Sequence, residues 1–198
     1  MNANPLLGQV LGALFGQAMS RRSMGTDRGG LGGGLGGAAL GSVLGGMLGG
    51  GARGAGAGLP ARRGGLAGNQ TALLLMLLPL AMRWVQRNGG MNAVLEKFRQ
   101  KGMVRQTQSW VDTGENQPLD EQSVEQVVGR DELAQMAQPL GVPEEQVAQA
   151  LAEIMPEMVD KMTPQGQLPE HADEVLDESR QTLEQEIQDV RQRDVTHS

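Results

Sequence analysis

Cysteine and tyrosine are absent from this chain of 198 residues, and its only aromatic side chains are two tryptophans and two phenylalanines. Without cysteine there is no disulfide framework and no thiolate metal site, which fits a reducing compartment. A secretory signal is also missing, because the opening residues, MNANPLLGQVLG, have no basic segment before their apolar residues. We therefore expect a cytoplasmic protein.

Long apolar runs are missing as well. No continuous apolar run reaches the roughly 18–20 residues that a membrane-spanning helix needs. The closest, ALLLMLLPLAM at residues 72–82, contains Pro79. A run of that length suits a buried helix better than a membrane span.

Acidic residues are scarce before residue 111 and abundant after it. Residues 1–70 hold six Arg and one Asp, a balance of +5, and residues 71–110 hold six Lys or Arg and one Glu, again +5. Residues 111–198 hold 21 acids against five basic residues, a balance of −16, so that the whole chain carries −6. An acidic half is a poor surface for nucleic acid, which binds through Lys and Arg. We expect no nucleic-acid partner, although the acidic half could attract basic segments of another copy.

Glycine is abundant but unevenly placed, with 23 of the 30 glycines in residues 1–70. Such a segment has too few large side chains to offset its ordering entropy by apolar burial. We therefore expect the core in a helical domain at residues 71–169, followed by an acidic C-terminal helix and tail at residues 170–198. No alternating strand pattern occurs anywhere, so the predicted fold class is all-α.

The first 20 residues predict an apolar helix at residues 5–19. Leu7, Leu11, Leu14 and Phe15 follow helical spacing, while glycines recur every fourth residue on the neighbouring face. A helix without charge that is apolar or smooth on nearly all sides needs a partner in water. Each of its glycines costs roughly 1 kcal/mol relative to alanine, so packing has to supply the difference.

Residues 21–70 are of low complexity. Within them, residues 29–52 carry no charge and place glycines four residues apart. This register comprises Gly33, Gly37, Gly41, Gly45 and Gly49. A spacing of four small residues lets two helix backbones approach closely. Three interpretations stay open: a Gly-rich linker, a glycine zipper that orders on self-association, and a membrane-inserted hairpin.

Catalytic and metal-binding patterns are not found. His171 and His197 stand alone, and no cofactor or metal site is predicted. Residues 133–151 have the spacing of a helix-turn-helix, but the second helix starts with Pro143, Glu144 and Glu145, which would repel phosphate, so we expect a packing corner. Paired carboxylates such as Asp173 and Glu174 lie in an acidic helix and are expected to be solvated.

Three stretches of the chain carry a resemblance to a known family. They are GGMNAVLEKFRQKG at residues 89–102, SWVDTGENQPLD at residues 109–120, and LAQMAQPLGVPEEQVAQALAEIMPEMVDKMTPQGQLPE at residues 133–170. With these stretches the chain resembles the YidB-like family of bacterial proteins of unknown function, over residues 5–16 and about 71–170. The resemblance implies a compact, orthogonal bundle of short helices. It implies no activity, substrate or catalytic residue.

The resemblance also gives a structural interpretation of the stretch SWVDTGENQPLD. Trp110 would end a helix and act as a core residue whose indole N–H finds a backbone acceptor. Gly114 would take a positive φ, and Asn116 would bond its own backbone or cap the next helix. The alternative is a ligand-binding corner around Trp110.

These patterns together predict a non-enzymatic protein that assembles with copies of itself. The predicted self-association residues are Leu7, Leu11, Leu14 and Phe15 in the N-terminal helix and Gly37, Gly41, Gly45 and Gly49 in the glycine register. Two alternatives stay open. One is a peripheral membrane protein with Arg21 and Arg22 near anionic headgroups. The other is a small-molecule binder or enzyme with a cleft near Trp110.

Overall fold

The computed structural model describes residues 5–23 and 70–196. Within these ranges the chain forms eight helices and no strand, which confirms the predicted all-α fold. The predicted glycine register at residues 33–49 lies outside the described residues. The helices are α1 (Pro5–Ser23), α3 (Gln70–Arg87), α4 (Gly90–Gln100), α5 (Val104–Val111), α6 (Glu121–Val128), α7 (Arg130–Leu140), α8 (Glu144–Met162) and α9 (Ala172–Thr196).

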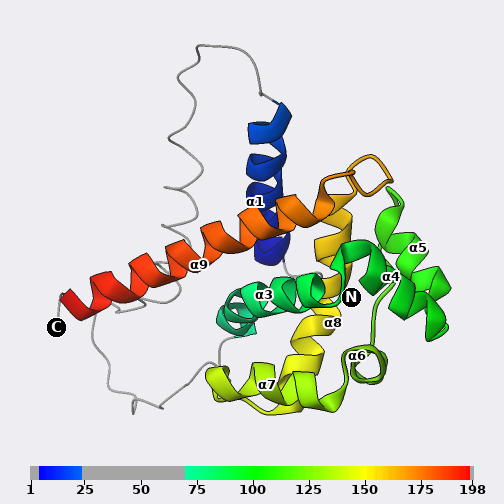
Figure 1. Cartoon of the computed structure of the whole chain (residues 1–198). Coiled ribbons are helices and arrows are strands. Elements are labelled where there is room, and N and C mark those ends of the chain that lie inside the picture. The colour runs from blue at the N-terminus through cyan, green and yellow to red at the C-terminus, as the bar shows by residue number, and fades with distance from the viewer. Residues whose placement is uncertain (1–4, 24–69, 197–198) are drawn as a thin grey trace, which may run out of the picture.

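Helix α8 is the centre of the bundle. It contacts α1, α3, α5, α6 and α7. In Figure 1, α3 and α7 cross it at steep angles, as in the predicted orthogonal arrangement, whereas α1 runs nearly parallel to it in this view. Helix α8 can make these contacts because its apolar residues surround it on several sides instead of forming one stripe. Its fully buried side chains include Leu151, Ile154, Met155, Met158 and Met162.

Local sequence signals set where several helices begin and end. Asp120 caps α6, since its carboxylate accepts a hydrogen bond from the Ser123 backbone N–H at 2.7 Å. Gly141 ends α7 in the left-handed conformation, with φ of 64°, which a glycine adopts without a side-chain clash. The following helix, α8, packs on α7, so the helix-turn-helix spacing corresponds to a packing corner.

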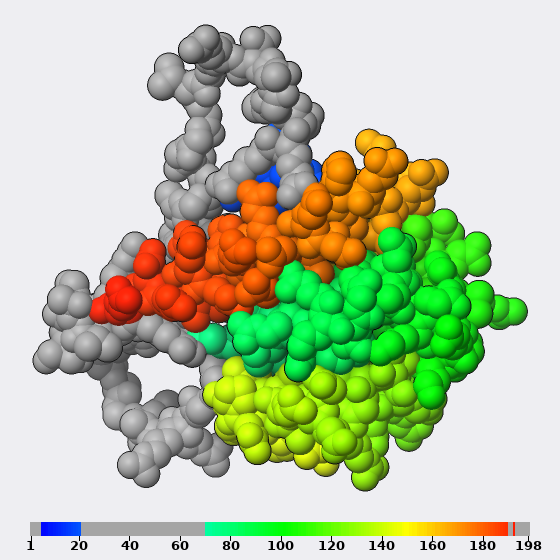
Figure 2. Space-filling view, viewed as in Figure 1, coloured from blue at the N-terminus to red at the C-terminus, as the bar shows by residue number. Residues whose placement is uncertain are grey.

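The two ends of the chain join the same hydrophobic core as the middle. One cluster of buried residues runs from Leu7 in α1 to Ile187 in α9. Helix α1 contacts α8 and α9, and α9 lies along α3 on the surface of the molecule (Figure 2). The segments expected at residues 1–20 and 170–198 therefore supply helices to the same folded body as the predicted domain at residues 71–169.

Candidate functional site

Helix α1 has an inner face that is buried in this chain. Its members lie against α8 and α9 and are each at most 3% exposed. We call this set the inner face: Leu7, Val10, Leu11, Leu14, Phe15 and Ala18. Their burial removes apolar surface from water, at roughly 1.5–3 kcal/mol for each large side chain. The inner face therefore holds α1 on the bundle.

This burial corrects the prediction that Leu7, Leu11, Leu14 and Phe15 face another copy. The helical spacing of these residues identified an apolar face correctly. It could not show that α8 and α9 of the same chain cover that face. Because the four side chains are already out of water, they offer no free surface for association in the chain as folded here.

Helix α1 also has an outer face, which consists of exposed residues with small or uncharged side chains. We define it as Gln9, Gly12, Ala13 and Gly16. Leu6 lies near its start and is 37% exposed. A Cβ added at Gly16 would meet nothing within 4 Å, and one at Gly12 would meet only the Cδ atom of Lys161, at 4.0 Å, among the described residues. The described part of the fold therefore has room for larger side chains at both positions.

Beside the inner face, α8 places a cluster of charged groups under the start of α1. A Cβ at Gly8 would lie 3.2 Å from Oε2 of Glu157, so the glycine lets this carboxylate approach the helix. The Lys161 Nζ atom lies 4.0 Å from that oxygen and 2.7 Å from Oδ2 of Asp160. Burial is the main cause that raises the pKa of Glu157, with a smaller contribution from Asp160, while Lys161 opposes it.

The first turn of α9 supplies a carboxylate to the start of α4. The Met91 backbone N–H donates to Oδ1 of Asp173 at 2.9 Å. A Cβ at Gly90 would lie 2.3 Å from both carboxylate oxygens, so only glycine leaves room for them. The positive end of a helix dipole favours such an anion. Asp173 stays exposed, as expected, and in addition binds the start of α4, a role that its position in an acidic helix did not reveal.

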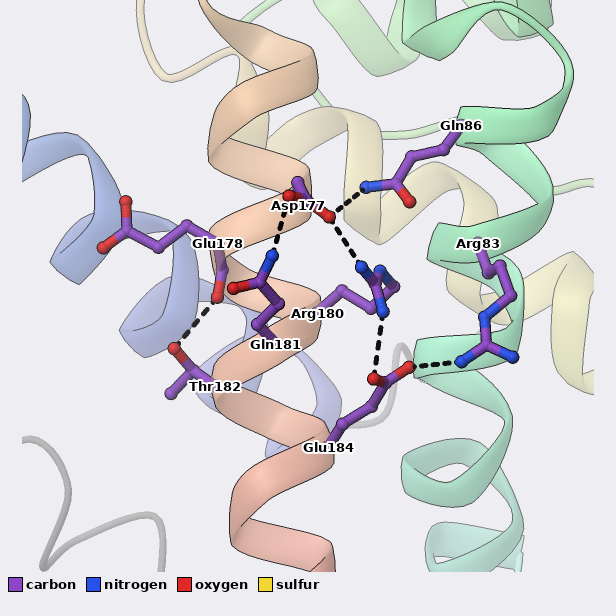
Figure 3. A network of polar contacts seen from close by, with 8 residues as sticks. All are labelled: Arg83, Gln86, Asp177, Glu178, Arg180, Gln181, Thr182 and Glu184. Carbon is purple, nitrogen blue, oxygen red and sulfur yellow. Dashed lines mark hydrogen bonds and ion pairs between the residues drawn. The ribbon is translucent and has the colours of Figure 1, made fainter.

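Further along α9, a ladder of polar contacts joins it to α3 (Figure 3). Gln86 donates to Oδ1 of Asp177 at 3.1 Å, and Arg83 pairs with Glu184 at 2.8 Å. Arg180, which also belongs to α9, donates hydrogen bonds to Asp177 and to Glu184. The bond to Asp177 is the main cause that lowers the pKa of that carboxyl. The ladder fixes the register of α9 along α3.

The apolar side of α9 is buried against the bundle, but its fit is incomplete. The buried apolar residues are Ala172, Val175, Leu176, Leu183 and Ile187. Among them lies Ser179, which is 1% exposed and whose hydroxyl has no hydrogen-bond partner. The Nε atom of Arg180 is also buried without one. A buried polar atom without a partner costs about 1–3 kcal/mol.

Trp110 is a structural residue, as the corner interpretation predicts. It is fully buried, and its indole Nε1–H donates to the Gln117 carbonyl oxygen at 2.8 Å. Its ring meets that of Phe98 edge to face, with centroids 5.4 Å apart. The Thr163 hydroxyl at the end of α8 reaches the Trp110 carbonyl oxygen at 3.3 Å. No exposed indole surface is left for a ligand.

Two details of that corner were predicted wrongly. Gly114 is not among the glycines with positive φ, and the Oδ1 atom of Asn116 is buried without a hydrogen-bond partner. The bond that holds the turn comes from Ser109, whose Oγ atom accepts from the Gln117 N–H at 2.9 Å. The cap of the next helix is Asp120. Turn composition alone could not distinguish these roles.

Three further properties bear on possible chemistry. The described residues hold no group of three or more His, Asp or Glu side chains placed to bind a metal ion. A shallow hollow of about 350 Å³ lies on α6, lined by Gln122, Glu125 and Gln126. None of the helices in the described ranges combines the length and apolarity needed to cross a bilayer.

Comparison with known sequences gives two matches, and both are to the same family. The sequence profile of a family described as YidB-like protein matches residues 6–171. The uncharacterized protein YidB of Escherichia coli (strain K12) is 28% identical over 96 residues, which cover 48% of this chain and 73% of that protein. No solved structure matches. The profile match includes α1 and ends one residue before α9.

Proposed function

We propose, from the premise that this chain belongs to the YidB-like family, that the protein is a non-enzymatic self-associating protein whose copies meet at the outer face of α1. The observation that carries this proposal is the pair of exposed helical glycines, Gly12 and Gly16. Each lowers helix stability by about 1 kcal/mol relative to alanine. The packing of the described residues does not require either of them. Close packing against a second helix would offset the helix stability that these two glycines cost.

Small residues spaced four apart allow two helix backbones to come closer than larger side chains permit. The outer face has this spacing between Gly12 and Gly16 and carries no charge. Two copies can therefore pack α1 against α1 with Lys161, which borders Gly12, as the charged group nearest to the contact. The glycine register with Gly37, Gly41, Gly45 and Gly49 could extend the same contact, and this part stays a prediction. Opposite charges on the two halves of the chain would orient the copies.

The test separates helix stability from association. Replacing both glycines by glutamine (Gly12→Gln with Gly16→Gln) adds bulk without charge to the outer face. We expect sedimentation velocity to show a shift from oligomer to monomer. The free energy of unfolding of the monomer should rise by about 1 kcal/mol per site, because glutamine is a better helix former than glycine.

The matched control replaces the same glycines by alanine. Alanine brings a similar gain in helix stability but stays small, so this variant should keep the association. The proposal fails if the unmodified chain is already monomeric at high concentration, or if the glutamine variant associates as strongly as the unmodified chain.

A further inference from the structure

Helix α9 lies in a groove whose walls belong to other helices. It contacts α1, α3 and α4, and Figure 2 shows it lying along α3 at the surface. We call this surface the α9 groove. The family profile covers all three wall helices and ends at residue 171, whereas α9 begins at Ala172. The groove thus belongs to the matched fold, and the helix that fills it lies beyond the match.

The α9 groove recognises its helix by three separate features. An apolar stripe on α9, including Leu176 and Leu183, is buried in it. Gln86 and Arg83 of α3 bond acids that lie two turns apart on α9. At one end, the start of α4 binds the Asp173 carboxylate through the Met91 N–H. An acidic amphipathic helix in a groove with basic and amide donors is a common mode of protein recognition.

The α9 groove binds α9 specifically, but two features allow α9 to be exchanged for the α9 of another copy. The unpaired Ser179 hydroxyl at the middle of the buried stripe weakens the hold on α9. The connection from α8 to α9, residues 163–171, is only nine residues long and holds Pro164 and Pro169. The two prolines restrict the backbone of this connection, and a stiff hinge segment favours exchange of a helix with an identical copy.

We propose that the α9 groove of one copy accepts α9 of a second copy, so that two chains exchange their C-terminal helices. The second copy is the occupant because every chain carries the helix whose apolar stripe, acids and first-turn carboxylate already match the groove. The exchange uses a surface separate from the outer face of α1 and does not depend on it. It would give a dimer in which each α9 lies along the partner's α3.

The test uses the natural absence of cysteine. One full-length chain carries Arg83→Cys, a second carries Glu184→Cys, and both carry the glutamine substitutions at Gly12 and Gly16 that are designed to remove α1-mediated contact. The side chains of Arg83 and Glu184 meet at 2.8 Å in this structure. The two chains are refolded together at high concentration and treated with a short bismaleimide. A control pair combines Arg83→Cys with Glu121→Cys on the exposed start of α6.

We expect a covalent dimer of the two chains in a yield several-fold above that of the control pair and rising with concentration. A chain with both cysteines should also crosslink internally when it folds alone, which checks the geometry. The proposal is overturned if internal crosslinking occurs while the two-chain yield equals that of the control pair. It is also overturned if a labelled peptide of residues 170–196 binds the chain but no crosslink between chains forms, since the groove would then take a helix without exchange between copies.

Discussion

Gly90 is fixed as glycine by two independent constraints. Its φ of 88° lies in the left-handed region, which costs a residue with a Cβ about 1–2 kcal/mol. In addition, a Cβ would overlap the Asp173 carboxylate at 2.3 Å. The neighbouring Gly89 shares the first constraint, with φ of 94°, but its Cβ would meet only the Ala93 Cβ, at 3.2 Å. Substitutions at Gly89 and Gly90 therefore distinguish the cost of backbone strain from the cost of losing the contact with α9.

Gly90→Ala should lower the free energy of unfolding by about 2–4 kcal/mol, because strain and loss of the Asp173 cap add together. Gly89→Ala should cost only the strain, about 1–2 kcal/mol. Urea denaturation followed by circular dichroism measures both. Equal costs for the two variants would mean that the carboxylate contact contributes nothing.

Residue roles were predictable where they depend on near neighbours in the chain. The resemblance implied that Trp110 is a buried residue with a bonded indole, and this is confirmed, with a partner only seven residues away. Asp173 could not be found in this way, because its partner Met91 is 82 residues away. Within the acidic helix nothing distinguishes it from the solvated carboxylates around it.

The packing of α9 can be improved by a single substitution at its buried serine. Ser179→Ala removes a buried hydroxyl that has no partner and replaces it with a better helix former. We expect the free energy of unfolding to rise by about 1 kcal/mol and Tm by about 2–4 °C. Differential scanning calorimetry measures the change.

The matched control is the same substitution in α5. Ser109→Ala removes a hydroxyl that donates to the Gln106 carbonyl oxygen and accepts from the Gln117 N–H. It should lower Tm, because both bonds are lost. If the two variants shift Tm in the same direction, the hydroxyl of Ser179 is not an unpaired group in solution.

The predicted boundaries of α1 and the predicted start of α9 fall within a few residues of those observed. Helix α1 was expected at residues 5–19 and extends to Ser23, and α9 was expected from Glu170 and begins at Ala172. Periodicity shows which face of a helix is apolar but not which helix covers it. For that reason the inner face of α1 was identified as a set of residues, while its covering by α8 and α9 was not.

For the molecule as a whole, two half-buried acids of α8 predict how stability depends on pH. Burial raises the pKa of Glu157 and of Glu153 above the ordinary value of 4.5. The folded state then holds protons more tightly than the unfolded state. Stability is therefore greater below pH 4.5 with respect to these two groups and falls as pH rises through their raised pKa values. Asp177 acts in the opposite sense, since its lowered pKa makes its contribution disappear as pH falls below 3.8.

Glu157→Gln should flatten the fall in stability above pH 4.5, because the amide has no charge to bury beside α1. Lys161→Gln should move the fall to higher pH, since Lys161 opposes the rise in the pKa of Glu157. Urea midpoints measured from pH 4 to pH 8 test both. Profiles that run parallel to that of the unmodified chain would exclude Glu157 as the source.

The meeting of α1 and α9 has a consequence for how the protein is made. The inner face of α1 leaves the ribosome long before α9 exists, and at about 5–20 residues per second the wait is roughly 8–30 s. Throughout this interval α1 lacks α9, one of the helices that contact it in the finished protein. We therefore expect the apolar side chains of α1 to stay only partly covered until translation ends.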